Sequence, residues 1–289
     1  MWFIYALIGA VGKSYSGLLR KKIANSISST MYIWVIYSLV LLALSPFMIS
    51  RTTEVINALQ ALPIIVFGSV VTNLLATKLN LEALKREELS YTAPLNALVP
   101  LFTLIIAGMF LNESPPRFGV LGVVAIVAGA YIVNIKPGRT LWYEPLKRLV
   151  TSTGAQLSIA VAFCYAINTV LIKVMTNDGY SSLTIFYLTT IIGWLLLLYV
   201  PVLRRKELKA IEKSDKLALL GGGVASFASG FFHILATAST FTSYATSVRR
   251  LDSLISILLG WRYLKETNIR IKLIGAFVMT FGAVLLAVS

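Results

Sequence analysis

The chain contains two copies of one sequence pattern, and the first copy is Tyr91-Thr-Ala-Pro-Leu-Asn-Ala-Leu-Val-Pro-Leu-Phe-Thr-Leu-Ile-Ile-Ala-Gly-Met-Phe-Leu-Asn-Glu113. A shift of 153 residues places Tyr91 on Tyr244, and the second copy ends Leu-Leu-Gly260-Trp-Arg-Tyr-Leu-Lys-Glu266. The same shift aligns Leu98 with Leu251, Leu111 with Leu264, Arg117 with Arg270, Gly122 with Gly275, Gly129 with Gly282 and Ala130 with Ala283. Chance can align leucines in an apolar chain, but it is a poor source of the charged and glycine pairs. The sequence therefore contains an internal repeat.

The composition places this repeat in a membrane. Hydrophobic residues make up 57% of the 289 residues and charged residues 13%, against about 45–50% and about 25% in soluble domains. Mean hydropathy is +0.80. Segments of about 20 apolar residues, the length that crosses a bilayer as a helix, predict ten spans: residues 2–20, 28–50, 59–84, 89–112, 116–135, 151–174, 180–202, 216–240, 241–263 and 268–288. We predict an all-α, polytopic membrane protein.

The repeat divides the ten spans into two halves. The first five-helix repeat covers residues 1–135, a linker that contains Pro137-Gly138 covers 136–150, and the second five-helix repeat covers 151–289. Because five is odd, the second half must enter the membrane in the opposite sense to the first. Inverted repeats of this kind are common in secondary transporters.

Basic residues predict the orientation. The chain has 26 Lys and Arg against 12 Asp and Glu, a net charge of +14, but most of them lie in short connections, so no nucleic-acid partner is expected. Counted together with the adjoining span ends, the connections after spans 1, 3, 5, 7 and 9 carry 19 Lys and Arg, and those after the even-numbered spans carry 3. The positive-inside rule makes the first set cytoplasmic and puts both termini outside.

The two copies of the quoted stretch, each followed by a span containing glycines, resemble the paired EamA-type units of the drug/metabolite transporter superfamily. The resemblance covers essentially the whole chain, and it is specific for the fold and weak for the substrate. It implies a central cavity lined by spans 1, 3, 4, 6, 8 and 9, with spans 5 and 10 at the periphery. That superfamily includes exporters of amino acids and metabolites, nucleotide-sugar carriers and sugar-phosphate translocators. Its members are often drawn with both termini in the cytosol, opposite to the orientation that the charges predict here.

Span 9 carries the strongest candidate site residues. Arg249 and Asp252 share one helical stripe with Ser253, Ser256 and Gly260. Charges near the middle of a span are costly and are functional by default, and Asp252 lies one turn from Arg249, so we expect these two to pair. The alternative is a purely structural ion pair.

Arg250 has no obvious partner in the sequence. It lies about 100° around the helix from Arg249, where it would either enter the edge of the cavity or extend toward the headgroups.

Span 1 carries Lys13 near its middle, beside Gly9, Ser16 and Gly17, which leave room around it. An ammonium group there needs an anion or water, which predicts a role in the cavity. The alternative is a side chain that reaches the interface.

Spans 3, 4 and 8 carry polar stripes that are predicted to form the walls of one pathway. His233 is the only histidine, and we favour a neutral hydrogen-bonding role for it over a proton relay. Pro94 and Pro100 predict a bend in span 4. The stripes are Asn73, Thr77 and Asn80 on span 3, Asn96, Pro100 and Thr103 on span 4, and Ser226, Gly230 and His233 on span 8.

Other features are interpreted structurally. The glycines at 122, 129, 275 and 282 are expected to pack helices or to form a dimer seam, with packing preferred. Glu113 and Glu266 are interpreted as turn or interface residues, Lys78 as a residue that reaches the headgroups, and the single Cys164 as a packing residue that forms no disulfide within the chain.

These observations favour a secondary transporter for a small, anionic organic metabolite. Within the spans, Lys13, Lys78, Arg249 and Arg250 outnumber the acidic residues Asp252 and Glu82. A flippase for lipids or lipid-linked substrates is the alternative. A membrane enzyme is disfavoured, because paired carboxylates and a phosphate-binding loop are missing from the sequence.

No cofactor or metal is expected. The predicted partners are the solute and the lipid bilayer, the chain is a monomer or homodimer, and the predicted location is the cell membrane.

Overall fold

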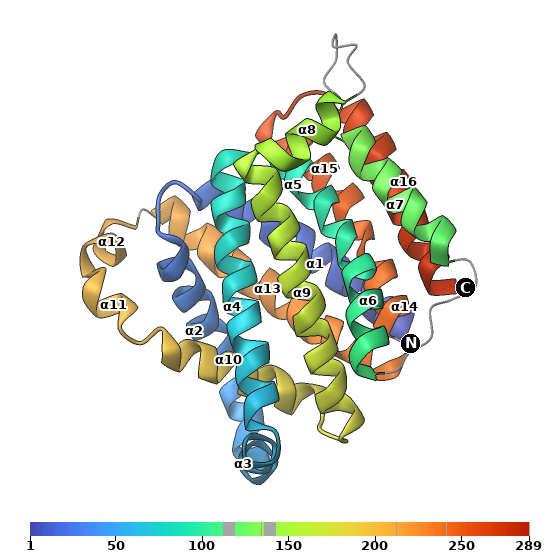
Figure 1. The fold of residues 1–289 in the computed structure, drawn as a ribbon. Helices are drawn as coiled ribbons and strands as arrows, with labels where there is room; N and C mark the ends of the chain where they lie inside the picture. The colour runs from blue at the N-terminus through green and yellow to red at the C-terminus, as the bar shows by residue number, and fades with distance from the viewer. Residues whose placement is uncertain (112–118, 134, 136–142, 212, 241, 289) are drawn as a thin grey trace.

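The computed structural model describes residues 1–111, 119–133, 135, 143–211, 213–240 and 242–288, and every regular element in these ranges is a helix (Figure 1). The helices are α1 (Trp2–Ile23), α2 (Ser29–Met48), η1 (Ile49–Arg51), α3 (Thr52–Ala61), α4 (Pro63–Arg86), α5 (Leu89–Leu95), η2 (Asn96–Leu98), α6 (Val99–Leu111), α7 (Gly119–Val133), α8 (Glu144–Thr151), α9 (Thr153–Asn177), α10 (Ser182–Leu196), α11 (Val200–Leu203), α12 (Arg205–Ala210), α13 (Lys213–Ser239), α14 (Thr242–Arg249), α15 (Leu251–Leu264) and α16 (Ile269–Val288).

Five stretches among the described residues are long and apolar enough to cross a membrane by length and composition. They are Ser29–Met48, Pro63–Arg86, Thr153–Asn177, Ser182–Leu203 and Asp215–Ser239. The all-α membrane class is therefore confirmed. Each of the other expected spans corresponds to a single helix or to consecutive shorter helices. The number of ten spans and their inverted arrangement stay predictions.

Two expected spans are broken rather than continuous. The span expected at 89–112 consists of α5, the short η2 and α6, and the span expected at 241–263 is divided at Arg250 into α14 and α15. In the first case Pro100 is the cause, because it has no backbone N–H to donate to the carbonyl of Asn96 four residues earlier. The shift of 153 residues carries Asn96 to Arg249, so the two breaks lie at equivalent places in the repeat.

The connections contain more helix than expected. The last residues of the expected linker 136–150 belong to α8, and α12 lies between expected spans. Helix α3 covers most of the connection expected after residue 50 and the first residues of the span expected at 59–84. Ser28 and Ser181, which are equivalent in the repeat, cap α2 and α10 with their side-chain oxygens. Both caps satisfy a free backbone N–H in the first turn of the helix.

Helices that are equivalent in the repeat make equivalent contacts. Helix α1 packs along α13, α4 packs along α9, and α7 packs along α16. The third pairing depends on glycine, since a Cβ at Gly129 would lie 2.6 Å from the carbonyl oxygen of Gly275, and one at Gly282 would lie 2.7 Å from that of Gly122. The glycines therefore pack helices within one chain, as expected, at positions where any larger residue would collide with backbone.

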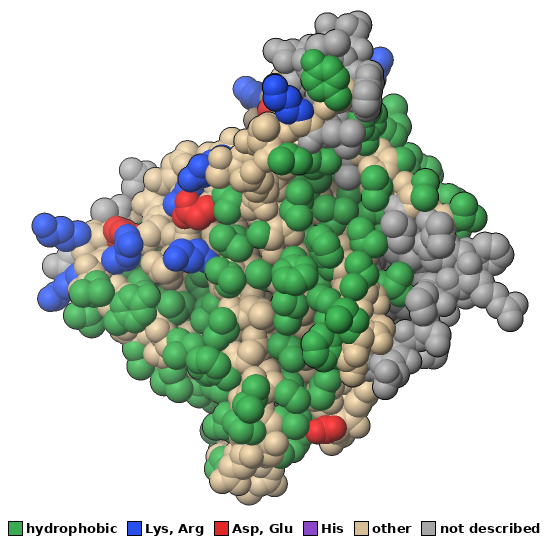
Figure 2. Space-filling model, viewed as in Figure 1, with side chains coloured by type: hydrophobic (Ala, Val, Ile, Leu, Met, Phe, Trp, Pro, Cys, Tyr) green, Lys and Arg blue, Asp and Glu red, His purple; other side chains and the backbone are tan. Residues whose placement is uncertain are grey.

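The surface matches a membrane-embedded body. Hydrophobic side chains cover the central part of the face in Figure 2, and Lys and Arg gather at the end where α8 and α12 lie. Ile64, Phe67, Val71 and Leu75 form an exposed stripe on α4, opposite to the polar stripe of the same helix. This stripe is what a lipid-facing helix surface requires.

Candidate functional site

A cavity of about 180 Å³ lies at the centre of the helices, and all the predicted site residues line it. Those residues are Lys13, Asn73, Thr77, Asn80, Asn96, His233, Arg249, Arg250 and Asp252. Helices α2 and α10 also contribute, through Tyr37 and Thr190 for example, so the lining that the family resemblance implied is incomplete. The described lining contains no residue of α7 or α16, as expected for peripheral helices.

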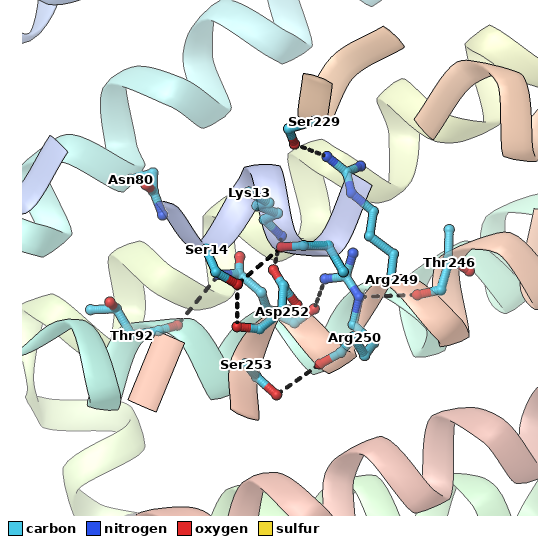
Figure 3. Close-up of polar contacts among 12 residues, drawn as sticks. Lys13, Ser14, Asn80, Thr92, Ser229, Thr246, Arg249, Arg250, Asp252 and Ser253 are labelled. Carbon is cyan, nitrogen blue, oxygen red and sulfur yellow. Dashed lines mark hydrogen bonds and ion pairs between the residues drawn. The ribbon is translucent and has the colours of Figure 1, made fainter. Parts of the chain in front are cut away.

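Asp252 pairs with Lys13 and not with Arg249. The Nζ of Lys13 lies 2.8 Å from Oδ2 of Asp252, which is 2% exposed (Figure 3). The hydroxyl of Ser14 donates to the backbone carbonyl of Asp252 at 2.9 Å, so two contacts join α1 to α15. The expected pairing of Asp252 with Arg249 is wrong because the helix breaks between them, which removes the one-turn spacing of a continuous helix.

Arg250 is enclosed and lines the cavity, so of the two positions that the sequence left open, the structure has the cavity and not the headgroups. Its side chain is 2% exposed. Its Nε donates to the carbonyl of Thr246 at 3.1 Å and its Nη1 to the carbonyl of Asn96 at 2.6 Å. The second acceptor is the carbonyl that Pro100 cannot bond in the α-helical manner. Arg250 therefore joins the break in one half to the break in the other (Figure 3).

Arg249 keeps hydrogen-bonding capacity toward the cavity. Its Nη2 donates to the hydroxyl of Ser229 at 2.9 Å, while its buried Nε has no hydrogen-bond partner. Nδ1 of His233 and Oδ1 of Asn96 are also buried without a partner. Unpaired buried polar atoms are unfavourable and are rare in folded proteins, so these three atoms are candidates for contact with a solute.

Arg20 belongs to the cavity, and the sequence interpretation missed it. Its Nη1 donates to Oδ1 of Asn80 at 2.9 Å, and its guanidinium lies over the ring of Tyr32 at 5.3 Å. In the sequence, Arg20 lies at the end of the span expected at 2–20, next to Lys21 and Lys22, where it resembles a basic residue of the membrane interface. The signal that could have found it is its spacing from Lys13 and Ser16, which puts all three on one face of a helix.

The polar walls are held by neighbouring helices. Asn73 donates to the hydroxyl of Tyr37 at 3.1 Å, the hydroxyl of Thr77 donates to its own helix, and Asn168 donates to Ser69 at 2.9 Å. Tyr165 faces Lys13, whose Nζ lies 5.5 Å from the centre of the ring. The tyrosines were not expected as lining residues, because an aromatic residue in an apolar span carries no distinguishing pattern.

Glu266 ties the two halves together outside the cavity. Its carboxylate accepts the backbone N–H groups of Leu89 and Ser90, both at 2.8 Å, at the start of α5. This agrees with the expected interface role. The free backbone N–H groups at the N-terminus of a helix also favour a negatively charged group such as this carboxylate. Its repeat equivalent, Glu113, lies outside the described residues. Lys78 is exposed, as expected.

The described part of the chain contains no group of three or more His, Cys, Asp or Glu side chains that could hold a metal ion.

Comparison with known proteins agrees with this architecture. The EamA-like transporter family matches residues 1–135 and 152–288, one match for each half. The chain belongs to the EamA-like transporter family. Its members are membrane transporters of small molecules rather than enzymes, so the chain is a multi-pass membrane protein of that class, within the drug/metabolite transporter superfamily.

A solved structure described only as "Crystal structure of protein" shares the fold. It is 15% identical to this family member, the match covers 98% of this chain and 96% of that one, and the TM-score is 0.65. At this identity the likeness concerns the fold alone. No curated protein sequence matches the chain.

Proposed function

We propose that this protein is a secondary transporter of a small, anionic organic metabolite, that it works by alternating access, and that it resides in the cell membrane. One observation carries the proposal: the described cavity lining has four lysine and arginine side chains and one carboxylate. The basic residues are Lys13, Arg20, Arg249 and Arg250, and the carboxylate is that of Asp252.

The contacts within the cavity leave two of these cations for a solute. Lys13 is paired with Asp252, and Arg250 is held by backbone carbonyls. Arg249 and Arg20 contact only neutral partners. A guanidinium group matches a carboxylate or phosphate with two parallel hydrogen bonds, and its attraction for an anion is stronger in a cavity than in bulk water.

The size of the cavity favours a small solute. Pockets for drug-sized ligands occupy about 300–1,000 Å³, and this cavity occupies about 180 Å³. A multidrug exporter for large cations is disfavoured on both size and charge.

The broken helices and the contacts between the halves support alternating access. Discontinuous helices at the centre of the membrane are typical of transporters built from inverted repeats. At one end of the molecule, Glu266 and Lys272 from the second half hold the start of α5, and Lys272 donates to the hydroxyl of Ser90 at 2.7 Å. Rocking of one half against the other would exchange such contacts for others.

The first prediction tests the role of Arg249. Anionic metabolites are expected to stabilise the purified protein in a thermal-shift screen, by about 2.7 kcal/mol at about 100 times the dissociation constant. Arg249→Lys keeps the charge but loses the planar fork, so we expect about 10-fold weaker binding and slower uptake into proteoliposomes. Lys78→Gln, which removes an exposed cation outside the cavity, is the matched control and should bind normally.

The proposal would be overturned if only neutral or cationic solutes stabilised the protein, or if Arg249→Lys transported as well as the wild type. Movement of a labelled lipid by proteoliposomes, with no uptake of soluble anions, would instead indicate the flippase.

The second prediction concerns orientation. The connections at 136–150 and 203–215 are expected in the cytoplasm and both termini outside. In a Cys164→Ala background, Arg205→Cys should resist an impermeant thiol reagent in intact cells and react after the cells are opened. Labelling in intact cells would refute the orientation and leave the fold unaffected.

A further inference from the structure

We propose that the solute carries two anionic groups, one at each end, and that it binds with one against Arg249 and the other against Arg20. The inference rests on the proposed transport of anions and specifies the class of anion: a short dicarboxylate or a compound of equivalent shape. Within the described cavity lining, Arg20 and Arg249 are the basic side chains held only by side chains without charge.

The end of the cavity at Arg20 is built around the guanidinium group. Asn80 accepts from Nη1 at 2.9 Å and Ser16 from Nη2 at 3.4 Å, and the group lies over the ring of Tyr32. The buried Nε of Arg20 and the buried hydroxyl of Tyr32 have no hydrogen-bond partner. These contacts fix the position of the charge and leave donors free for an anion.

The end at Arg249 is built in the same way. Ser229 accepts from Nη2 at 2.9 Å, and the buried Nε has no partner. Nδ1 of His233 is likewise buried without a partner and lines the same cavity. In both cases a neutral hydrogen bond orients an arginine whose charge is not neutralised by a carboxylate.

The spacing of the two ends suits a short solute. Ser16 bonds Ser226 at 2.8 Å, and Ser226 and Ser229 are three residues apart on α13, which is roughly 4.5 Å along a helix. Lys13 and Arg20 are seven residues apart on α1, which is roughly 10 Å. In Figure 3, Asn80 and Arg249 lie on opposite sides of Lys13. Hydrogen bonds to Ser16 and Ser229 therefore hold the two guanidinium groups at either end of a short row of serines, which a chain of a few carbon atoms can follow.

The balance of charge points the same way. Four basic side chains and one carboxylate leave three positive charges in the described lining. A monoanion would leave two of them uncompensated, whereas a dianion would leave one. Like charges close together in a low dielectric repel strongly, so a second anionic group lowers the energy of the loaded cavity. The wall between the two ends is polar and uncharged, with Tyr37, Asn73 and Asn168, and it accommodates a neutral middle.

The test uses the purified full-length chain and compares five probes by calorimetry and thermal shift. Succinate and glutarate carry a charge at each end, monomethyl succinate and butyrate carry one charge, and glycerol 3-phosphate carries its charge at one end only. Succinate or glutarate should bind about 10-fold to 100-fold more tightly than the monoanions, the ratio expected for one additional charged contact.

Variants assign the two ends. Arg20→Gln should remove the preference for succinate over monomethyl succinate. The affinity for butyrate should stay within about twofold, which is under about 0.5 kcal/mol, because its single carboxylate can still bind at Arg249. Arg249→Gln should weaken both. Lys78→Gln is the control and should change neither. If Arg20→Gln folds poorly, Asn80→Ser, which removes the acceptor that orients Arg20, should give a smaller loss of the same preference.

The outcomes separate this inference from the proposed function. Equal affinity for succinate and its half-ester, tight binding of glycerol 3-phosphate that is insensitive to Arg20→Gln, or a succinate preference that survives that substitution would overturn the two-ended solute and leave anion transport standing. Failure of all five anions in binding and uptake, with a neutral or cationic solute transported, would overturn both.

Discussion

Replacing Asp252 by Ala is expected to lower the free energy of unfolding by about 3–5 kcal/mol and to abolish transport. Asp252 is buried beside Lys13, and removal of one partner of a buried ion pair leaves an uncompensated charge. The cost is large here because Arg20, Arg249 and Arg250 line the same cavity as Lys13, so the substitution leaves four basic groups there with no carboxylate. In a purified sample the melting temperature should fall by roughly 10 °C.

Lys13→Met provides the matched comparison. We expect a smaller loss of stability, because Asp252 then still has basic neighbours. The double variant Lys13→Met, Asp252→Leu removes both charges and should recover much of the stability lost in Asp252→Ala. Strictly additive losses in the double variant would contradict the ion pair as the cause.

Replacing Arg250 by Met is expected to cost about 3 kcal/mol of stability, because two hydrogen bonds from a charged group are lost and the buried carbonyl of Asn96 loses a donor. Arg250→Lys should also destabilise, since an ammonium group cannot reproduce a planar group that holds two carbonyls on different helices. Both effects should appear in the melting temperature of the protein without solute.

Arg249 is the control for this prediction, because it neighbours Arg250 and has the same charge. Arg249→Lys should change solute affinity more than stability, and Arg250→Lys should do the opposite. If Arg250→Met melted like the wild type but lost solute binding, Arg250 would be a solute ligand instead of a connection between the two broken helices.

The class of fold and the residues from which the site is drawn follow from the sequence alone. Apolar segments of bilayer length can satisfy their backbone only as helices, so the positions of the helices follow from composition. Charges such as Lys13 and Asp252 are too costly to face lipid, so their position in the cavity also follows from the local sequence. The packing role of the glycine pairs of α7 and α16 could also be predicted from the sequence, since small residues repeated along a helix indicate that another helix approaches closely.

The contacts between these residues depend on how the helices pack in three dimensions. Asp252 is three residues from Arg249 in the chain, but the helix breaks between them and α1 brings Lys13 within 2.8 Å. Arg250 has no partner in its own segment of sequence, because its second acceptor is a carbonyl on η2 that Pro100 leaves without the usual donor. Arg20 looks like an interfacial charge until Asn80 and Tyr32 enclose it. Periodicity predicts the face of a helix on which a side chain lies, whereas its partner depends on how separate helices pack, which local sequence does not encode.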